Sequence, residues 1–130
     1  MTDNVMRILC VDHSPWELME LKHDVKHIMP EAAVRGCRTS EKAVALAKSE
    51  GCDVLLTEFD FGGPKWEGLE LAERIKGINP LVNIIFVTAF SERDYAREVI
   101  QLRVSGFVRK PYEQKELAKE LANLRYPVAQ

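Results

Sequence analysis

Four short apolar runs in the sequence each end in side chains that can take part in chemistry. The residues are acids, a hydroxyl and a lysine: Asp12, Glu58, Asp60, Thr88 and Lys110. Carboxylate oxygens can hold a hard cation, and an ammonium group can neutralise an anion. If the runs are neighbouring parallel strands, their carboxyl ends lie along one edge of a sheet, where ligands bind. We therefore expect these side chains to converge on one pocket.

The segments between these residues alternate between strand-like and helix-like patterns. Apolar runs predict five strands, at residues 7–11, 33–37, 54–59, 83–87 and 106–109. The first, third and fourth are nearly continuous in apolar residues, as expected of central strands covered on both faces, whereas the more polar second run suits an edge. The alternation predicts an α/β fold in which a five-stranded parallel, doubly wound (βα)5 sheet carries helices on both faces.

Capping residues and apolar stripes predict the helices. Ser14 as N-cap and Pro15 at the first position open a helix that Pro30 stops, and a second helix runs over residues 40–50. The inward faces of the last three helices are predicted as Leu69, Ala72 and Ile75 before Asn79-Pro80, then Tyr95, Val99 and Leu102 after a Ser91 cap, then Leu117, Leu121 and Leu124 until Pro127. We interpret these stripes as core positions rather than ligand sites.

Length and composition indicate an ordinary globular domain. The 130 residues are 46% hydrophobic and 29% charged with a net charge of −2, which gives no bulk attraction to nucleic acid or to a membrane. We expect one domain over residues 1–125 and a tail over residues 126–130. The tail is either the end of a natural single-domain protein or the start of a linker to an effector domain outside this chain.

Cysteine usage and the first residues indicate the compartment. Cys10, Cys37 and Cys52 have no C-x-x-C spacing, and we interpret them as small buried residues of a protein in a reducing environment. The N-terminal segment has no long apolar stretch that would serve as a signal peptide or membrane anchor. We therefore expect a cytoplasmic protein.

Four sequence blocks together resemble the receiver domain of two-component response regulators. The blocks are ILCVDHSP, DVLLTE with GLEL, NIIFVTAF and SGFVRKP, and the resemblance covers essentially the whole chain. It implies a flavodoxin-like, receiver-type fold. It also implies a phosphoacceptor aspartate after the third strand, Mg²⁺ held there and by acids after the first strand, a hydroxyl that follows the phosphoryl group, and a lysine that neutralises it.

Individual residues match these positions. Asp12, Thr88 and Lys110 stand at the metal, hydroxyl and lysine positions, and Phe107 stands at the position of the switch aromatic. Each also has a structural interpretation: a helix cap for Asp12, a strand residue for Thr88, a solvated turn residue for Lys110 and a core residue for Phe107. Their joint placement at consecutive strand ends favours a common pocket.

Two positions depart from the family pattern. His13 stands where receivers carry a second acid, and imidazole is a poor ligand for Mg²⁺, although His13 can equally be a loop residue without a role. At the third strand, counting forward from Asp53 assigns the acceptor position to Glu58. Counting back from Pro64 and Gly68 assigns it to residue 60 instead.

Burial favours Glu58 at the acceptor position. If Asp60 were at the strand tip, Glu58 would lie on the same face of a central strand, where an unpaired carboxylate is costly. With Glu58 at the tip, VLLT is a clean buried strand and the extra residues fall in a glycine-containing loop. The longer glutamate side chain could then pair with Lys110 and approach Thr88, and Asp60 could still bind Mg²⁺ weakly.

The function predicted from these features is a receiver-like signalling module of a two-component phosphorelay, not an enzyme. It is expected to be atypical and phosphorylation-independent, with Glu58 in place of the phosphoacceptor aspartate and Mg²⁺ binding weak or absent. One alternative is a working Mg²⁺-dependent phosphoacceptor that uses Asp60. Another is a flavin-binding or hydrolytic protein on the same fold, for which no G-x-G-x-x-G, P-loop or G-x-S-x-G motif is present.

The expected partners follow from the resemblance alone. They are a histidine kinase or another protein, a DNA-binding effector domain outside this chain with a role in transcription regulation, and a second copy in a homodimer. Receivers commonly make such contacts with the fourth helix, the fifth strand and the fifth helix. We expect no direct binding of this chain to nucleic acid or membrane.

Overall fold

A computed structural model of the protein describes residues 5–91 and 96–124. In it, parallel strands form one five-stranded sheet in the order β2-β1-β3-β4-β5. The strands are β1 (Arg7–Val11), β2 (Ala33–Cys37), β3 (Val54–Thr57), β4 (Asn83–Thr88) and β5 (Gly106–Arg109). The predicted α/β class is confirmed, and the polar run of β2 lies at an edge. The third strand is shorter than predicted and ends at Thr57 rather than at residue 59.

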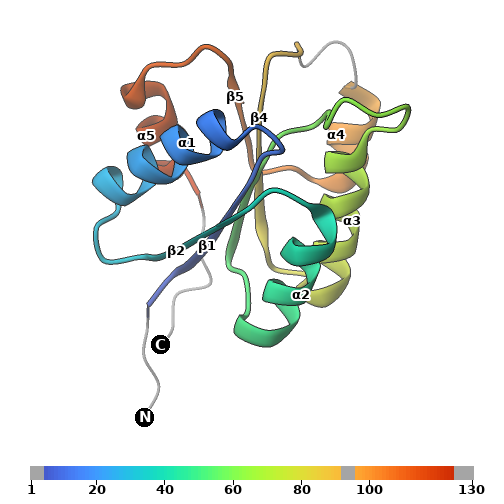
Figure 1. Cartoon of the computed structure of the whole chain (residues 1–130), viewed down its shortest axis with the longest axis horizontal. Coiled ribbons are helices and arrows are strands. Elements are labelled where there is room, and N and C mark those ends of the chain that lie inside the picture. The colour runs from blue at the N-terminus through green and yellow to red at the C-terminus, as the bar shows by residue number, and fades with distance from the viewer. Residues whose placement is uncertain (1–4, 92–95, 125–130) are drawn as a thin grey trace.

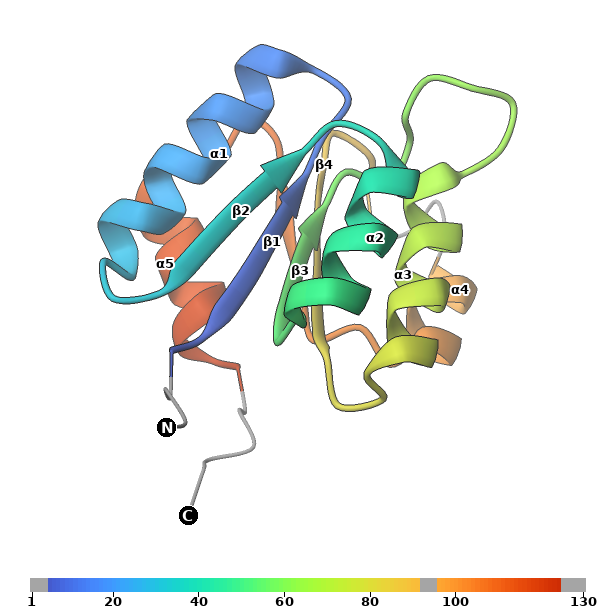
Figure 2. The same ribbon diagram turned by 60° about the horizontal axis from the view of Figure 1, so that its bottom comes forward.

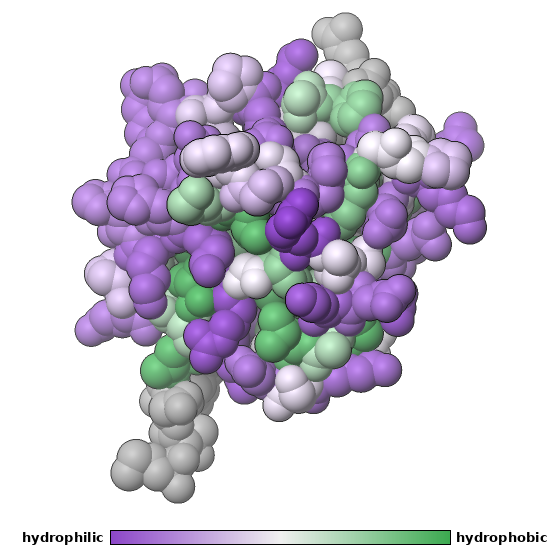
Figure 3. Space-filling view, in the orientation of Figure 1, coloured by the Kyte–Doolittle hydropathy of each residue, from purple (hydrophilic) through white to green (hydrophobic). Residues whose placement is uncertain are grey.

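Helices cover both faces of the sheet. In the described residues they are α1 (Pro15–Ile28), α2 (Ser40–Glu50), α3 (Glu67–Ile78), α4 (Ala96–Leu102) and α5 (Gln114–Ala122). Figures 1 and 2 show α1 and α5 on one side of the sheet and α2, α3 and α4 on the other. Figure 3 shows that hydrophilic side chains cover most of the face turned to the viewer, and that hydrophobic ones gather between the helical layers.

The last helix is shorter than predicted, and some predicted features of the last two helices fall outside the described residues. α5 ends at Ala122, before the predicted stop at Pro127, because Asn123 caps the last turn while Leu124 remains buried outside the helix. The predicted inward position of Tyr95, the stop at Pro127 and the tail over residues 126–130 lie outside the described residues. The side chain of Val99 and the connection from Ser91 to α4 are likewise not described.

The start of α1 is fixed by its cap. Ser14 is the N-cap and its hydroxyl accepts a hydrogen bond of 3.3 Å from the backbone N–H of Glu17, while Pro15 occupies the first helical position. Both features were predicted, and a hydroxyl that accepts from an otherwise unpaired N–H stabilises a helix start by about 1 kcal/mol. The cap places the first turn of α1, including Glu17, beside the carboxyl edge of the sheet.

The sheet separates two apolar layers. Leu9, Leu55 and Ile84 belong to the cluster on the side of α2 and α3, whereas Ile8 and Leu56 belong to the cluster on the side of α1 and α5. All residues of β3 and β4 are buried, as the continuous apolar runs predict for central strands. The edge where these strands end is therefore held rigidly from both sides.

The cysteines are part of this core. Cys10, Cys37 and Cys52 are buried and free, as predicted. Burial raises the pKa of the Cys37 thiol to about 11 and that of the Cys52 thiol to about 12. Because the thiolate is the reactive form, these cysteines act as small apolar side chains. Among the described helices none has the length and apolar character needed to cross a membrane.

Strand register places the candidate residues next to one another. Val11 pairs with Thr57, and Thr57 pairs with Phe86 in β4. The next residues along β1 and β3 are Asp12 and Glu58, so their backbones leave the sheet side by side. The backbone N–H of Glu58 still donates to the carbonyl of Val11 at 3.0 Å.

Candidate functional site

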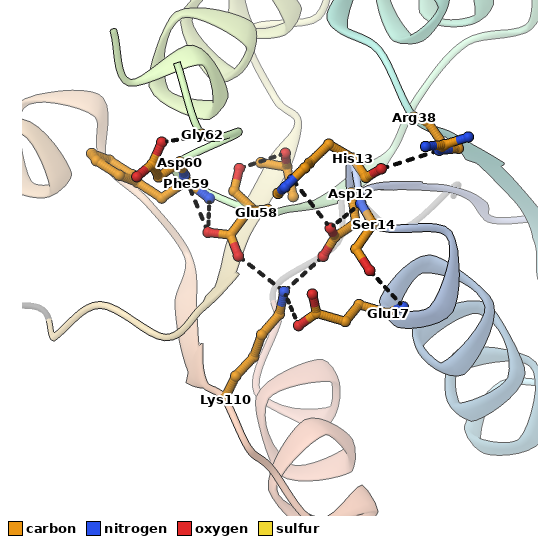
Figure 4. A network of polar contacts seen from close by, with 11 residues as sticks. Asp12, His13, Ser14, Glu17, Arg38, Glu58, Phe59, Asp60, Gly62 and Lys110 are labelled. Carbon is orange, nitrogen blue, oxygen red and sulfur yellow. Dashed lines mark hydrogen bonds and ion pairs between the residues drawn. The ribbon is translucent and has the colours of Figure 1, made fainter. Parts of the chain in front are cut away.

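The ammonium group of Lys110 is the centre of the candidate site. Its Nζ lies 2.7 Å from Oδ2 of Asp12, 2.9 Å from Oε1 of Glu58 and 2.9 Å from Oε1 of Glu17. Figure 4 shows the lysine reaching from the end of β5 into the space between the three carboxylates. We call these four residues the Lys110 cluster. It joins the ends of β1, β3 and β5 to the first turn of α1.

Both oxygens of the Glu58 carboxylate are occupied. Oε1 accepts from Lys110, and Oε2 accepts from the backbone N–H groups of Phe59 at 2.7 Å and Asp60 at 3.1 Å. Glu58 is only 7% exposed. A buried carboxylate is tolerated where it is paired and hydrogen-bonded, and Glu58 meets both conditions.

The Asp60 carboxylate is turned toward its own loop. Its Oδ1 accepts a hydrogen bond of 2.8 Å from the backbone N–H of Gly62, in the geometry of an Asx turn. Gly62 has φ of +93°, a conformation that favours glycine. Figure 4 shows Asp60 on the side of Gly62, away from Lys110. The structure thus brings Glu58, and not Asp60, into the Lys110 cluster.

Thr88 and Phe107 lie near the cluster without joining it. The Thr88 carbonyl accepts from the backbone N–H of Lys110 at 2.8 Å, and its hydroxyl oxygen accepts from the N–H of Phe90 at 3.3 Å. The backbone N–H of Phe107 donates to Oε1 of Glu120, and the Phe107 ring packs against the apolar cluster on the side of α2 and α3. The structure therefore places Thr88 at the carboxyl end of β4 and Phe107 partly in the core.

His13 covers the rim of the site. Its Nδ1 lies 3.6 Å from Oδ1 of Asp12, and its ring stacks on Phe61 with centroids 5.9 Å apart. The same Asp12 oxygen accepts from the backbone N–H of Ser14 at 2.9 Å. The His13 carbonyl accepts from Nε of Arg38 at 3.1 Å, so the loop after β1 is anchored on both sides.

The electrostatics of the cluster favour its charged form. Burial opposes the charge on Lys110, but the hydrogen bonds to Asp12, Glu17 and Glu58 outweigh that effect and raise the pKa of Lys110 above its ordinary value. The hydrogen bond from Lys110 lowers the pKa of Glu17. Lys110 and Glu17 thus each favour the ionised state of the other.

The donor set is a poor fit for the Mg²⁺ that the resemblance implies. The carboxylate oxygens of Asp12 and Glu58 that face the site already accept hydrogen bonds from Lys110, and His13 offers a nitrogen where a second acid would offer an oxygen. Over residues 5–91 and 96–124, no group of three His, Cys, Asp or Glu side chains is placed to hold a metal ion. In this arrangement a single ammonium bridges the three carboxylates of Asp12, Glu17 and Glu58 at the position where a metal would otherwise compete for them.

The start of α3 lies directly against the backbone of Glu58 and Phe59. The N–H of Gly68 donates to the carbonyl of Phe59 at 2.9 Å, and a Cβ at Gly68 would overlap the carbonyl oxygen of Glu58. The Phe59 ring is fully buried and packs edge-on against Phe86 and at a tilt against Trp66. These contacts fix the backbone on both sides of the Glu58 side chain.

Glu17 was not predicted from the sequence. It looks like an ordinary acid in the first turn of a helix, where negative charge is favoured by the helix dipole. One signal was present: a residue one turn into the helix that follows β1 lies near the same sheet edge as Asp12. The Glu17 side chain remains 47% exposed, so it closes the outer side of the Lys110 cluster.

Comparison with known proteins gives a consistent family. A family model described as the response regulator receiver domain matches residues 8–122. The chain is 28% identical over 114 residues to the transcriptional regulatory protein NatR of Bacillus subtilis (strain 168), a match that covers 88% of this chain and 47% of NatR. The chain spans less than half the length of the curated relatives it matches.

Solved structures share the fold. A response regulator receiver domain protein from Clostridium thermocellum superposes with a TM-score of 0.77 at 21% identity, covering 92% of this chain and 93% of that chain. The chemotaxis protein CheY4 of Vibrio cholerae superposes with a TM-score of 0.81 at 19% identity, covering 93% of this chain and 99% of that chain. At such identities the likeness concerns the fold alone.

Proposed function

The chain belongs to the response regulator receiver domain family, and from that premise we propose that it is an atypical receiver whose acceptor position is held by Glu58. Receiver domains are generally signalling modules rather than enzymes, and we assign this chain the same role. Its conformational balance is set without phosphorylation. The observation that carries this proposal is the 2.9 Å contact between Glu58 and Lys110.

The chemistry of a phosphoacceptor requires a free carboxylate oxygen. The two oxygens of Glu58 are engaged by Lys110 and by backbone N–H groups, so attack on a phosphodonor would first break charge-assisted hydrogen bonds. A glutamate is also one methylene longer than an aspartate and carries its charge toward the lysine. The Lys110 cluster therefore supports a domain with a built-in negative charge where a phosphoryl group would otherwise lie.

The same geometry supports weak or absent Mg²⁺ binding. An incoming Mg²⁺ would compete with Lys110 for Asp12 and Glu58, and a dication placed close to a buried ammonium is repelled. The rival proposal, a working acceptor at Asp60, requires Asp60 to leave the N–H of Gly62 and turn toward Lys110. The strand bounds favour Glu58, because β3 ends at Thr57.

The partners of this module are proposed from the family and its relatives. We assign it a protein partner, such as a histidine kinase, that binds in the cytoplasm at the surface of α4, β5 and α5, where a homodimer would also form. The name of NatR describes a transcriptional regulatory protein. By analogy, residues 1–125 form the receiver and residues 126–130 lead to a DNA-binding effector domain.

Exposure to a small phosphodonor tests the proposal. The protein, with Glu58→Gln and Asp60→Asn variants beside it, is incubated with acetyl phosphate and Mg²⁺ and examined by intact mass. We expect no gain of one phosphoryl group, under conditions that label a receiver with an acceptor aspartate. An acid-labile gain located at residue 58 would refute the proposal, and a gain abolished by Asp60→Asn would establish the rival acceptor.

A further inference from the structure

A cavity lies between α1 and the turn that follows β5. Its volume is about 430 Å³, within the range of roughly 300–1,000 Å³ that small-molecule sites occupy. Glu17, Glu20 and Leu21 of α1 form one wall, and Ala89 and Tyr112 lie on the other side. Asp12 and Lys110 also line it, whereas Glu58, Thr88 and Asp60 are not part of the described lining, so the cavity lies on the α1 side of the Lys110 cluster.

The cavity carries an excess of negative charge. The carboxylates of Asp12, Glu17 and Glu20 line it, against the single ammonium of Lys110. Lys110 is paired with the first two of these and with Glu58, whereas Glu20 lies outside the Lys110 cluster. A cation that enters the cavity therefore meets Glu20, whose charge the lysine does not directly neutralise.

The opposite wall is apolar and fixed in position. The Tyr112 hydroxyl donates to Oδ2 of Asp24 at 3.1 Å, and the Gln114 amide donates to Oδ1 of the same carboxylate at 2.9 Å. Burial together with the nearby Asp24 raises the pKa of Tyr112, so its hydroxyl stays neutral. Leu21 is buried behind the cavity. Tyr112, which lines the cavity, is thus held in place through its hydroxyl.

We propose that this cavity binds a small organic cation, that is, an amine or guanidinium group on an apolar or aromatic body. The cationic group pairs with Glu20 at the acidic wall, and the body packs on Leu21 and the ring of Tyr112. An aromatic face next to carboxylates attracts cations through both the ring quadrupole and the charges. The same carboxylates repel anions of equal size. The site shares Asp12, Glu17 and Lys110 with the Lys110 cluster, but Glu58 does not line it, so the proposal holds whichever residue occupies the acceptor position.

Three probes of the same shape and different charge test the proposal. Benzamidine is cationic, benzamide neutral and benzoate anionic, and each is titrated into the full chain while backbone NMR shifts are recorded. We expect saturable shifts with benzamidine at Glu20, Leu21, Ala89 and Tyr112, weaker ones with benzamide and none with benzoate. Higher salt is expected to weaken benzamidine binding, because the acidic wall is open to solvent.

A matched pair of variants locates the charge. Glu20→Gln is expected to weaken benzamidine binding about two- to fivefold, the range for a solvent-exposed charge pair. Glu70→Gln removes an exposed charge from α3 on the other side of the sheet and is expected to have no effect.

The proposal is overturned if benzamidine gives no saturable shifts at these residues, if benzamide or benzoate binds as well as benzamidine, or if the two variants behave alike. N-acetylarginine amide distinguishes a protein side chain from a free ligand. Binding of this compound without binding of benzamidine would assign the cavity to a partner protein and refute the small-molecule proposal.

Discussion

Nζ of Lys110 lies 2.9 Å from Oε1 of Glu58, so the lysine after β5 is neutralised by the residue after β3. The contact joins the ends of β3 and β5, the two strands on either side of β4. Because Lys110 also donates to Asp12, the end of β1 is joined to them as well. The lysine is also largely buried, because its side chain is 12% exposed. Its removal would leave two buried carboxylates close together without a counter-charge.

Replacement of this lysine is the first prediction. Lys110→Met keeps much of the side-chain volume but leaves Asp12 and Glu58 unpaired in a buried site. We expect a loss of about 3–5 kcal/mol in the free energy of unfolding, the range for breaking one side of a buried ion pair. Urea denaturation measures the change. Lys48→Met, at an exposed position of α2, is the control, and equal stability of the two variants would contradict the arrangement.

The second prediction concerns Glu17 and pH. The hydrogen bond from Lys110 holds the pKa of Glu17 below its ordinary value of 4.5. Ionised Glu17 therefore adds stability above pH 4.5, and this contribution is lost as the pH falls through the lower pKa of the folded state. The wild type should exceed Glu17→Gln in stability by less than about 1 kcal/mol at neutral pH, because solvent screens this half-exposed side chain.

Urea denaturation of both proteins at neutral and acidic pH checks this prediction. The difference between them should shrink as the pH falls below 4.5. Glu41→Gln provides a control, because Glu41 is an exposed acid that also lies in the first turn of a helix, α2, but is not paired with Lys110. A difference that grows on acidification would contradict the pairing of Glu17 with Lys110.

Much of the fold could be predicted because its signals are local. The strands over residues 7–11, 33–37 and 106–109 match the prediction residue for residue, and each ends directly before a charged residue, namely Asp12, Arg38 or Lys110. The end of α5 could not be predicted, because the apolar stripe continues to Leu124 after the helix has ended at Ala122. Leu124 is buried without being helical, and the apolar pattern of a sequence indicates burial but not helicity.

The site could be predicted in part. That Asp12, Glu58 and Lys110 would meet follows from strand order, since each follows a strand of one parallel sheet. The contact of Glu17 with Lys110 joins residues far apart in sequence and depends on the angle at which α1 leaves the sheet. The contact of Tyr112 with Asp24 likewise depends on how α1 packs against α5. Neither arrangement has a signal in periodicity or spacing.

The third prediction concerns a double variant that carries the family's residues at the two positions where this chain departs from the family pattern. His13→Asp with Glu58→Asp supplies a second acid and shortens the carboxylate at the strand tip. We expect this double variant to gain one phosphoryl group from acetyl phosphate with Mg²⁺, measured by intact mass, and Glu58→Asp alone to gain less. His13→Asp alone should gain none, because Glu58 still engages Lys110. Absence of a gain in the double variant would show that these two positions do not decide whether the domain takes up a phosphoryl group.

The fourth prediction uses two glycines of the same helix. A Cβ at Gly68 would overlap the carbonyl oxygen of Glu58 and lie 2.8 Å from Cα of Phe59, both backbone atoms that cannot move aside cheaply. Gly68→Ala is therefore expected to lower the free energy of unfolding by about 1–3 kcal/mol, as overpacking does. At Gly77 a Cβ would meet nothing within 4 Å, so Gly77→Ala should raise it by about 0.5–1 kcal/mol through better helix propensity. If urea denaturation shows that the two substitutions change the free energy of unfolding in opposite directions, the close approach of the backbone at Gly68 is the cause. Equal changes in the two variants would refute this explanation.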